Sequence, residues 1–193
     1  MDYFKQLIDM LNQNCNIEII SNNIIEGNTN NTFDLFRHGI SDEIKYIYNN
    51  YKRFDLHWEE KNGISHGYVI FVPYEEILKE HKELCEMAEH MEADLIEEQD
   101  EVINDLSHWY PLFYFPNGDA FCYDDRNGNV VFYEHEVFDM GINLHGLLIA
   151  ESIDSLFEKW SQVLFGDIYD WYEGVSELGI DLSKPVYKGL LNT

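Results

Sequence analysis

The sequence predicts a single α+β domain, because segments of helical periodicity occur in the same chain as two β-hairpin signals. Apolar residues that recur every three or four positions indicate amphipathic helices. Two Asn-Gly pairs, at 62–63 and 127–128, each stand between β-rich runs, which is a strong hairpin signal. A chain of 193 residues with 45% hydrophobic residues can bury one substantial core, and we expect one domain over residues 1–193.

The first fifty residues predict two helices separated by a short strand and a loop. The helical period covers 3–13. Residues 14–21 are a strand candidate, and the overlapping stretch 21–32 is rich in turn-forming residues and predicts a loop. Ser41 has the character of an N-cap and is followed by acids, so a helix is predicted over 42–52.

After the second predicted helix, the apolar period changes to two. Phe54, Leu56 and Trp58 alternate with polar residues, and Asn62-Gly63 leads to the apolar run Tyr68–Val72. Alternation on both sides of an Asn-Gly pair predicts a hairpin that is half buried.

The segment 74–107 predicts one long helix, or two, with a narrow apolar stripe and a broad acidic face. Thirteen acids and two lysines lie between Glu75 and Ser107. One interpretation is a solvated face, and the other is a surface that meets a basic partner. On the second interpretation, the partner-binding residues are Glu92, Glu97, Glu98 and Glu101, with Asp124 and Asp125 of the hairpin that comes next in the chain.

The second hairpin is predicted by two β-rich runs on either side of Arg126-Asn127-Gly128. A short strand over 147–151 then leads to a helix from about residue 153. The tail predicts a short helix near Ile168–Leu178, and Pro185 prevents a regular helix or strand in the last residues of the chain.

The acids of this hairpin raise the question of a metal or acid–base site. Asp125, Asn127 and Asn129 have the spacing of a calcium loop, but such a loop needs Gly at its sixth position, and Gly128 is the fourth. A tight Asn-Gly turn explains the same residues better. Asp124 and Asp125 point to opposite faces of a strand, so they cannot cooperate as a carboxylate dyad.

Signatures of catalysis and cofactor binding are missing elsewhere: the sequence has no HExxH, GxSxG, P-loop or GxGxxG. His81 and Cys85 lie four apart on a predicted helix, which is fewer ligands than zinc needs. Cys122 lies in a strand among aromatic residues, the usual place of a small buried thiol. We therefore expect no enzymatic activity, no cofactor and no metal; an enzyme that uses scattered carboxylates is the weaker alternative.

Composition limits the partners and the compartment. The net charge of −25, from 37 acids and 12 bases, repels phosphate backbones and anionic membranes and favours a basic protein partner. Charge that serves only solubility is the alternative. Three widely spaced cysteines without a CxxC fit a reducing compartment, the N-terminus has no signal-peptide pattern, and no apolar run approaches the ~20 residues of a membrane span. We expect a cytoplasmic protein.

The stretch "FPNGDAFCYDDRNGNVVFYEHE", followed by "GLLIAESIDSLFEKW", resembles the signature of the SUKH superfamily, which includes fungal Smi/Knr-type cell-wall regulators and many bacterial immunity proteins. That signature runs Gly-Asp, apolar strand, Asp, turn, Gly-x-Val, and His before an acid. The matching features are Gly118-Asp119, Phe121–Tyr123, Asp124, Gly128-x-Val130 and His135-Glu136.

The resemblance covers about residues 40–165, and the chain differs from it by an extra N-terminal helix and loop and a longer acidic segment. It implies an α+β fold with a twisted, mostly antiparallel sheet and helices packed around it. It implies no catalysis; for bacterial members it implies direct neutralisation of a secreted polymorphic toxin, often a nuclease, in the cytoplasm. The residues to which the resemblance assigns structural roles are Trp109, Gly118, Asp119, Asp124, Gly128 and His135.

The expected function is therefore that of an immunity protein that binds a basic toxin domain. The alternative is a regulatory or scaffold protein that binds an endogenous protein. Trp109 is either a core anchor or an exposed binding aromatic, and we favour the core.

Overall fold

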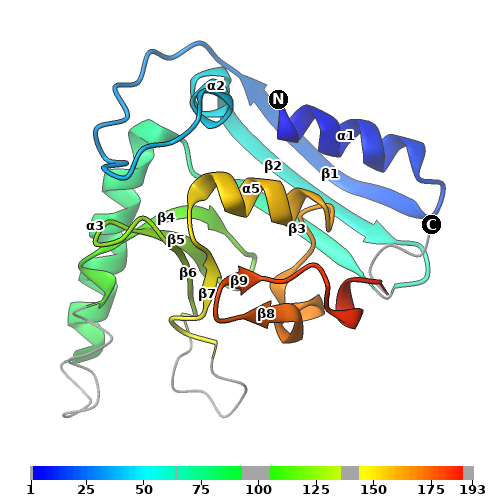
Figure 1. Ribbon diagram of the computed structural model, residues 1–193. Coiled ribbons are helices and arrows are strands. Elements are labelled where there is room, and N and C mark those ends of the chain that lie inside the picture. Colours follow the sequence, from blue (N-terminus) through cyan, green and yellow to red (C-terminus); the bar gives the residue numbers. More distant parts are fainter. Residues whose placement is uncertain (1, 64, 93–104, 136–143, 189–193) are drawn as a thin grey trace.

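The computed structural model describes residues 2–63, 65–92, 105–135 and 144–188. Within these ranges the fold is α+β, as the sequence predicts: a seven-stranded antiparallel sheet has four α-helices packed around it (Figure 1). The strands lie in the sheet in the order in which they occur in the chain. They are β1 (Ile17–Glu26), β2 (Tyr51–Glu60), β3 (His66–Phe71), β4 (Trp109–Tyr114), β5 (Ala120–Asp124), β6 (Val130–Tyr133) and β7 (Leu148–Ala150).

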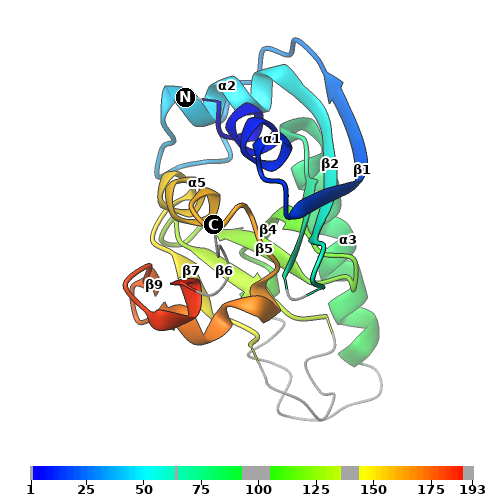
Figure 2. The same ribbon diagram turned by 90° about the vertical axis from the view of Figure 1, so that its right-hand side faces the viewer.

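The four helices lie on both faces of the sheet. They are α1 (Tyr3–Gln13), α2 (Asp42–Asn50), α3 (Tyr74–Glu92) and α5 (Ile153–Ser161). Figure 2 shows α1, α2 and α5 on one side of the strands and α3 on the other. Three of them begin with side-chain caps: Asp2, Ser41 and Ser152 accept the backbone N–H groups that the first turn leaves unpaired.

Side chains that point alternately to the two faces of the central strands form two separate cores. On β5, Phe121 and Tyr123 face the large core beneath α1, α2 and α5, whereas Ala120 and Cys122 face a smaller core beneath α3. The large core is mainly aromatic; the rings of Phe4 and Phe54, for example, stack with centroids 3.9 Å apart. Side chains that alternate across a strand thus let one sheet bury both faces.

Three tryptophan side chains hold the turn that follows α5, and one of them belongs to the sheet. The indole N–H of Trp58 donates to the carbonyl of Leu164 at 3.0 Å, and those of Trp160 and Trp171 donate to the carbonyl of Gly166. Leu164 adopts a φ of 52°, which is rare for a residue with a side chain. The indole bonds help to hold the backbone in this turn.

The N-terminal strand corrects one sequence-based prediction. The loop predicted for 21–32 is strand as far as Glu26, because Ser21–Ile25 pair with residues of β2. Cross-strand pairing overrides the low β-propensity of Asn22 and Asn23.

The tail is the second correction. The short helix predicted near Ile168–Leu178 is replaced by two 3₁₀ turns and a small hairpin. These elements are η1 (Ile168–Asp170), η2 (Tyr172–Gly174), β8 (Val175–Ser176) and β9 (Gly179–Ile180), and a third turn, η3 (Pro185–Lys188), comes after them. Gly179 has a φ of 83°, and a Cβ there would lie 2.3 Å from the carbonyl oxygen of Ile149, so a glycine is needed at the hairpin turn.

Candidate functional site

The end of β5 holds a buried carboxylate in a dense network. Asp124 is 2% exposed and accepts hydrogen bonds from the indole of Trp109 at 3.3 Å and from the backbone and guanidinium of Arg126. Arg126 also reaches Asp105, with 2.8 Å between Nη1 and the carboxylate. The carboxylate of Asp124 is therefore directed inward, and a partner that met this turn would contact Arg126 before Asp124.

The acidity of Asp124 reflects two opposed causes. Burial would raise the pKa of its carboxyl, but the hydrogen bonds and positive charge of Arg126 outweigh burial and lower the pKa below its ordinary value. Asp124 is thus held as a carboxylate at neutral pH, as an anchor for the β5–β6 turn.

Asp125, the second acid predicted to bind a partner, joins that turn to two other segments. Its carboxylate lies 2.8 Å from Nδ1 of His108 and 3.6 Å from Nη1 of Arg37. Gly128 has a φ of 86°, and a Cβ there would lie 2.8 Å from the side chain of His38. The turn is packed against the loop that precedes α2, which leaves the side chain of Asp125 only 12% exposed.

A second buried carboxylate, that of Asp119, lies at the other end of the hairpin. Asp119 is 1% exposed and accepts from the backbone N–H and Nδ1 of His135, from Asn117 at 2.6 Å and from the hydroxyl of Tyr169 at 2.7 Å. Gly118 has a φ of 95° and lies against the imidazole of His135. These contacts join the β4–β5 turn to the end of β6 and to the 3₁₀ turn η1.

The acidic segment is described only in part. Glu97, Glu98 and Glu101 lie outside the described residues, and so does the side chain of Glu92, at the end of α3. In the first three turns of α3 the charge is mixed, because Lys79 and Lys82 form i,i+4 ion pairs with glutamates on the same helix. The acidic surface predicted from the sequence therefore depends on residues beyond the described part of α3.

His81 and Cys85 share a face of α3, as their spacing predicts. Nδ1 of His81 lies 2.6 Å from the carbonyl of Trp109, so it carries the proton, and Nε2 lies 3.7 Å from the thiol of Cys85. The thiol also donates to the carbonyl of Leu106 at 3.5 Å. The bond of His81 attaches α3 to β4, and the bond of Cys85 attaches α3 to the residues before β4. Among the described residues, no group of three or more His, Cys, Asp or Glu side chains is arranged to hold a metal ion.

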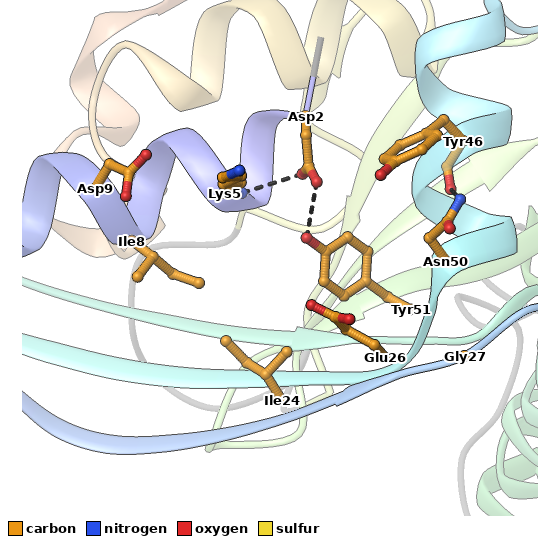
Figure 3. A pocket seen from close by; sticks show the side chains of 10 residues that line it. All are labelled: Asp2, Lys5, Ile8, Asp9, Ile24, Glu26, Gly27, Tyr46, Asn50 and Tyr51. Atoms are coloured by element: carbon orange, nitrogen blue, oxygen red, sulfur yellow. Dashed lines mark hydrogen bonds between the residues drawn. The ribbon is translucent and has the colours of Figure 1, made fainter.

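An open pocket lies between α1, the end of β1 and the end of α2 (Figure 3). It has a volume of about 400 Å³, and its lining includes the carboxylates of Asp2, Asp9 and Glu26 against one base, Lys5. Figure 3 shows α1 along one side, β1 along the other and α2 at one end. The arrangement suits a positively charged group.

Two features add to the negative character of the pocket. The C-terminal end of α2, at Asn50, lines it, and the carbonyl end of a helix carries partial negative charge. The rings of Tyr46 and Tyr51 offer faces that attract a cation. The hydroxyl of Tyr51 donates to Asp2 at 2.9 Å, which fixes that carboxylate at the pocket wall.

Sequence reasoning did not find this pocket. Its acids come from α1 and β1 and its tyrosines from α2 and β2, so no local motif marks it. The nearest signal was the acidic composition itself, which predicts the kind of ligand but not the place.

Comparison of the chain with protein-family models, with curated protein sequences and with solved structures gives no match. A search of the described residues finds no helix with the length and apolar character that a membrane span requires.

Proposed function

We propose that this protein is a non-enzymatic binding protein for a basic protein domain, and that it acts as an immunity protein that neutralises a toxin, as the resemblance to the SUKH superfamily implies. The observation that carries the proposal is the charge balance. With 37 acids and 12 bases, 25 carboxylates have no intramolecular counter-charge even if every base pairs with one acid. Such a field attracts basic surfaces and accelerates their association.

Half of the bases are already engaged within the chain, which favours a basic protein over a nucleic acid as the partner. Among the described residues, six of the 12 bases form ion pairs with acids of the same chain. These bases are Arg37, Lys45, Arg53, Lys79, Lys82 and Arg126. A phosphate backbone would therefore meet few unengaged cations, whereas a basic protein would meet many carboxylates.

The hairpin supports the resemblance through the roles of its residues. Asp119 fixes His135, Asp124 fixes the β5–β6 turn, and Gly118 and Gly128 adopt positive φ beside side chains that pack closely. Each of these features has a structural reason, so the pattern is that of a scaffold motif. This agrees with a family defined by its fold and its partners.

The test begins with the open reading frame next to the gene. The probe is the C-terminal domain of a large secreted protein encoded there, if that domain is basic. We expect the domain to arrest growth when expressed alone, co-expression of this chain to restore growth, and the two purified proteins to bind in calorimetry. Binding without growth arrest would favour the regulatory alternative, and an absence of binding, or of such a gene, would contradict the immunity proposal.

A further inference from the structure

The first strand forms a long free edge of the sheet. β1 is the outermost strand, and among the described residues it pairs with β2 on one side and with no strand on the other. In Figures 1 and 2 it runs along the border of the molecule, with α1 on one side. The opposite edge strand, β7, has three residues and contacts the small β8–β9 hairpin, so β1 is the edge on which another strand has room to pair.

This edge lacks most of the features that protect edge strands. The strand "IEIISNNIIE" has no Lys, Arg or Pro, and Ile20 and Ile25 are each 49% exposed. A bulge between Ile19 and Ser21 interrupts its first half, which leaves Ser21–Ile25 as a regular run. In an antiparallel pair every second residue directs its N–H and C=O away from the neighbouring strand, so this run presents paired donors and acceptors outward.

The edge and the acidic pocket are continuous. Ile24 and Glu26 belong to β1 and also line the pocket, opposite Asp9 of α1 and Asp2, the N-cap of that helix. In a strand added to β1, every second side chain would lie on the α1 side of the sheet, beside these carboxylates.

On the other side of the sheet, positive and negative charge balance at this point. Arg53 of β2, the cross-strand partner of Ile25, lies on that side and forms an ion pair with Asp55 at 3.0 Å. A basic side chain of an added strand is therefore favoured on the pocket side.

We infer that an extended segment of the basic partner adds to β1 as an eighth strand of the sheet and places one Lys or Arg side chain in the pocket. The inference rests on the proposed function, which supplies a basic partner. Main-chain bonds would give the contact its affinity, and the pocket would select the basic side chain. A second copy of this chain fits less well, because antiparallel pairing centred on Asn22 would place Glu18 opposite Glu26, and each copy carries a net charge of −25.

The first experiment measures amide hydrogen exchange of the full chain with and without the basic domain described above. The edge variant is Ile20→Lys with Ile25→Lys, and its control, Leu78→Lys with Met87→Lys, adds the same charge at exposed apolar residues of α3. The pocket variant is Asp9→Asn with Glu26→Gln, and its control is Glu173→Gln with Glu177→Gln, two exposed acids of the C-terminal part. Thermal melts establish that all four variants fold.

We expect the domain to slow exchange in Ser21–Ile25, and the edge and pocket variants to bind it at least about tenfold more weakly, mainly through faster dissociation, with each control within about threefold of wild type. A second probe, a short synthetic peptide of alternating valine and arginine, should protect the same amides, whereas its glutamate counterpart should not.

The two probes separate the possible failures. If the domain binds wild type but leaves β1 unprotected and the edge variant unimpaired, the inference is overturned and the proposed function stands. If the domain does not bind at all, the proposed function is contradicted, and only the peptide then tests whether β1 accepts an added strand. Failure of the arginine peptide to protect β1 would then overturn the inference as well.

Discussion

The imidazole of His135 lies 2.8 Å from the carboxylate of Asp119, although sixteen positions separate the two residues in the chain. The same carboxylate also accepts hydrogen bonds from the side chains of Asn117 and Tyr169 and from the backbone N–H of His135. A buried carboxylate with several donors stabilises the loops it joins, and removing its charge weakens every one of these bonds.

Replacing Asp119 with Asn should therefore destabilise the protein by about 1.5–3 kcal/mol, the range for a hydrogen bond to a charged group. Urea denaturation measures the free energy of unfolding. Asp34→Asn, at an exposed position, is the matched control and should leave that free energy unchanged. Equal denaturation midpoints for the two variants would contradict a structural role for Asp119.

Substitutions at Trp109 measure how much the smaller core, beneath α3, contributes to stability. Its side chain is 2% exposed, and its indole N–H reaches Asp124. Trp109→Ala should cost about 3–5 kcal/mol, because it leaves a cavity beneath α3. Trp109→Phe keeps much of the packing and should cost less. Unchanged stability together with lost partner binding would show instead that Trp109 acts at a binding surface.

The acid dependence of stability should reflect Asp124. Because its pKa is lowered in the folded state, its contribution is fully present above the unfolded value of about 4 and is lost as the pH falls through the folded value. Arg126→Met removes the guanidinium bonds and the positive charge, so the pKa of Asp124 should rise toward its ordinary value and its contribution to stability should become smaller.

Free energies of unfolding between about pH 3 and pH 6 test this expectation over the range in which carboxyls titrate. The wild type should lose more stability over that range than either Arg126→Met or Asp124→Asn, which removes the titrating group. Parallel curves for the three proteins would contradict the role assigned to Arg126.

Folding should not depend on a metal ion. The sequence contains no ligand set typical of a structural metal site, so melting temperatures with and without a chelator should coincide. A drop of many degrees in the chelator would reveal a site that the sequence patterns do not mark.

The sequence predicts much of the fold, and local signals explain which parts. Ser41 caps α2 as expected, and the residues around Asn62-Gly63 form the β2–β3 hairpin. Local signals failed at Asn22 and Asn23, where pairing with β2 decides the structure, and in the tail, where tryptophan contacts hold short turns. The assignment to one domain stays a prediction.

The candidate sites divide in the same way. Asp119 and His135 lie at the same end of the hairpin that the sequence predicts around Asn127-Gly128, so their contact is local to that hairpin. The pocket combines Asp9 with Glu26, from a helix and a strand that only the tertiary fold brings together. No spacing rule connects such residues.

The acidic segment should govern the rate at which the partner is captured. Changing Glu92, Glu97, Glu98 and Glu101 to Gln should slow association and flatten its salt dependence, with little effect on stability, because like charges close together in the sequence repel each other. The matched control changes four exposed acids elsewhere: Asp34→Asn, Glu151→Gln, Glu173→Gln and Glu177→Gln. If the two quadruple variants behave alike, the acidic segment acts only through its share of the net charge.

Charge-driven capture of a basic protein can be measured as the association rate of the wild-type chain with the neighbouring basic domain as a function of ionic strength. We expect rates that approach ~10⁸–10⁹ M⁻¹s⁻¹ at low salt and fall steeply as salt is added. A rate near the neutral value of ~10⁵–10⁶ M⁻¹s⁻¹ that does not change with salt would contradict charge-driven capture.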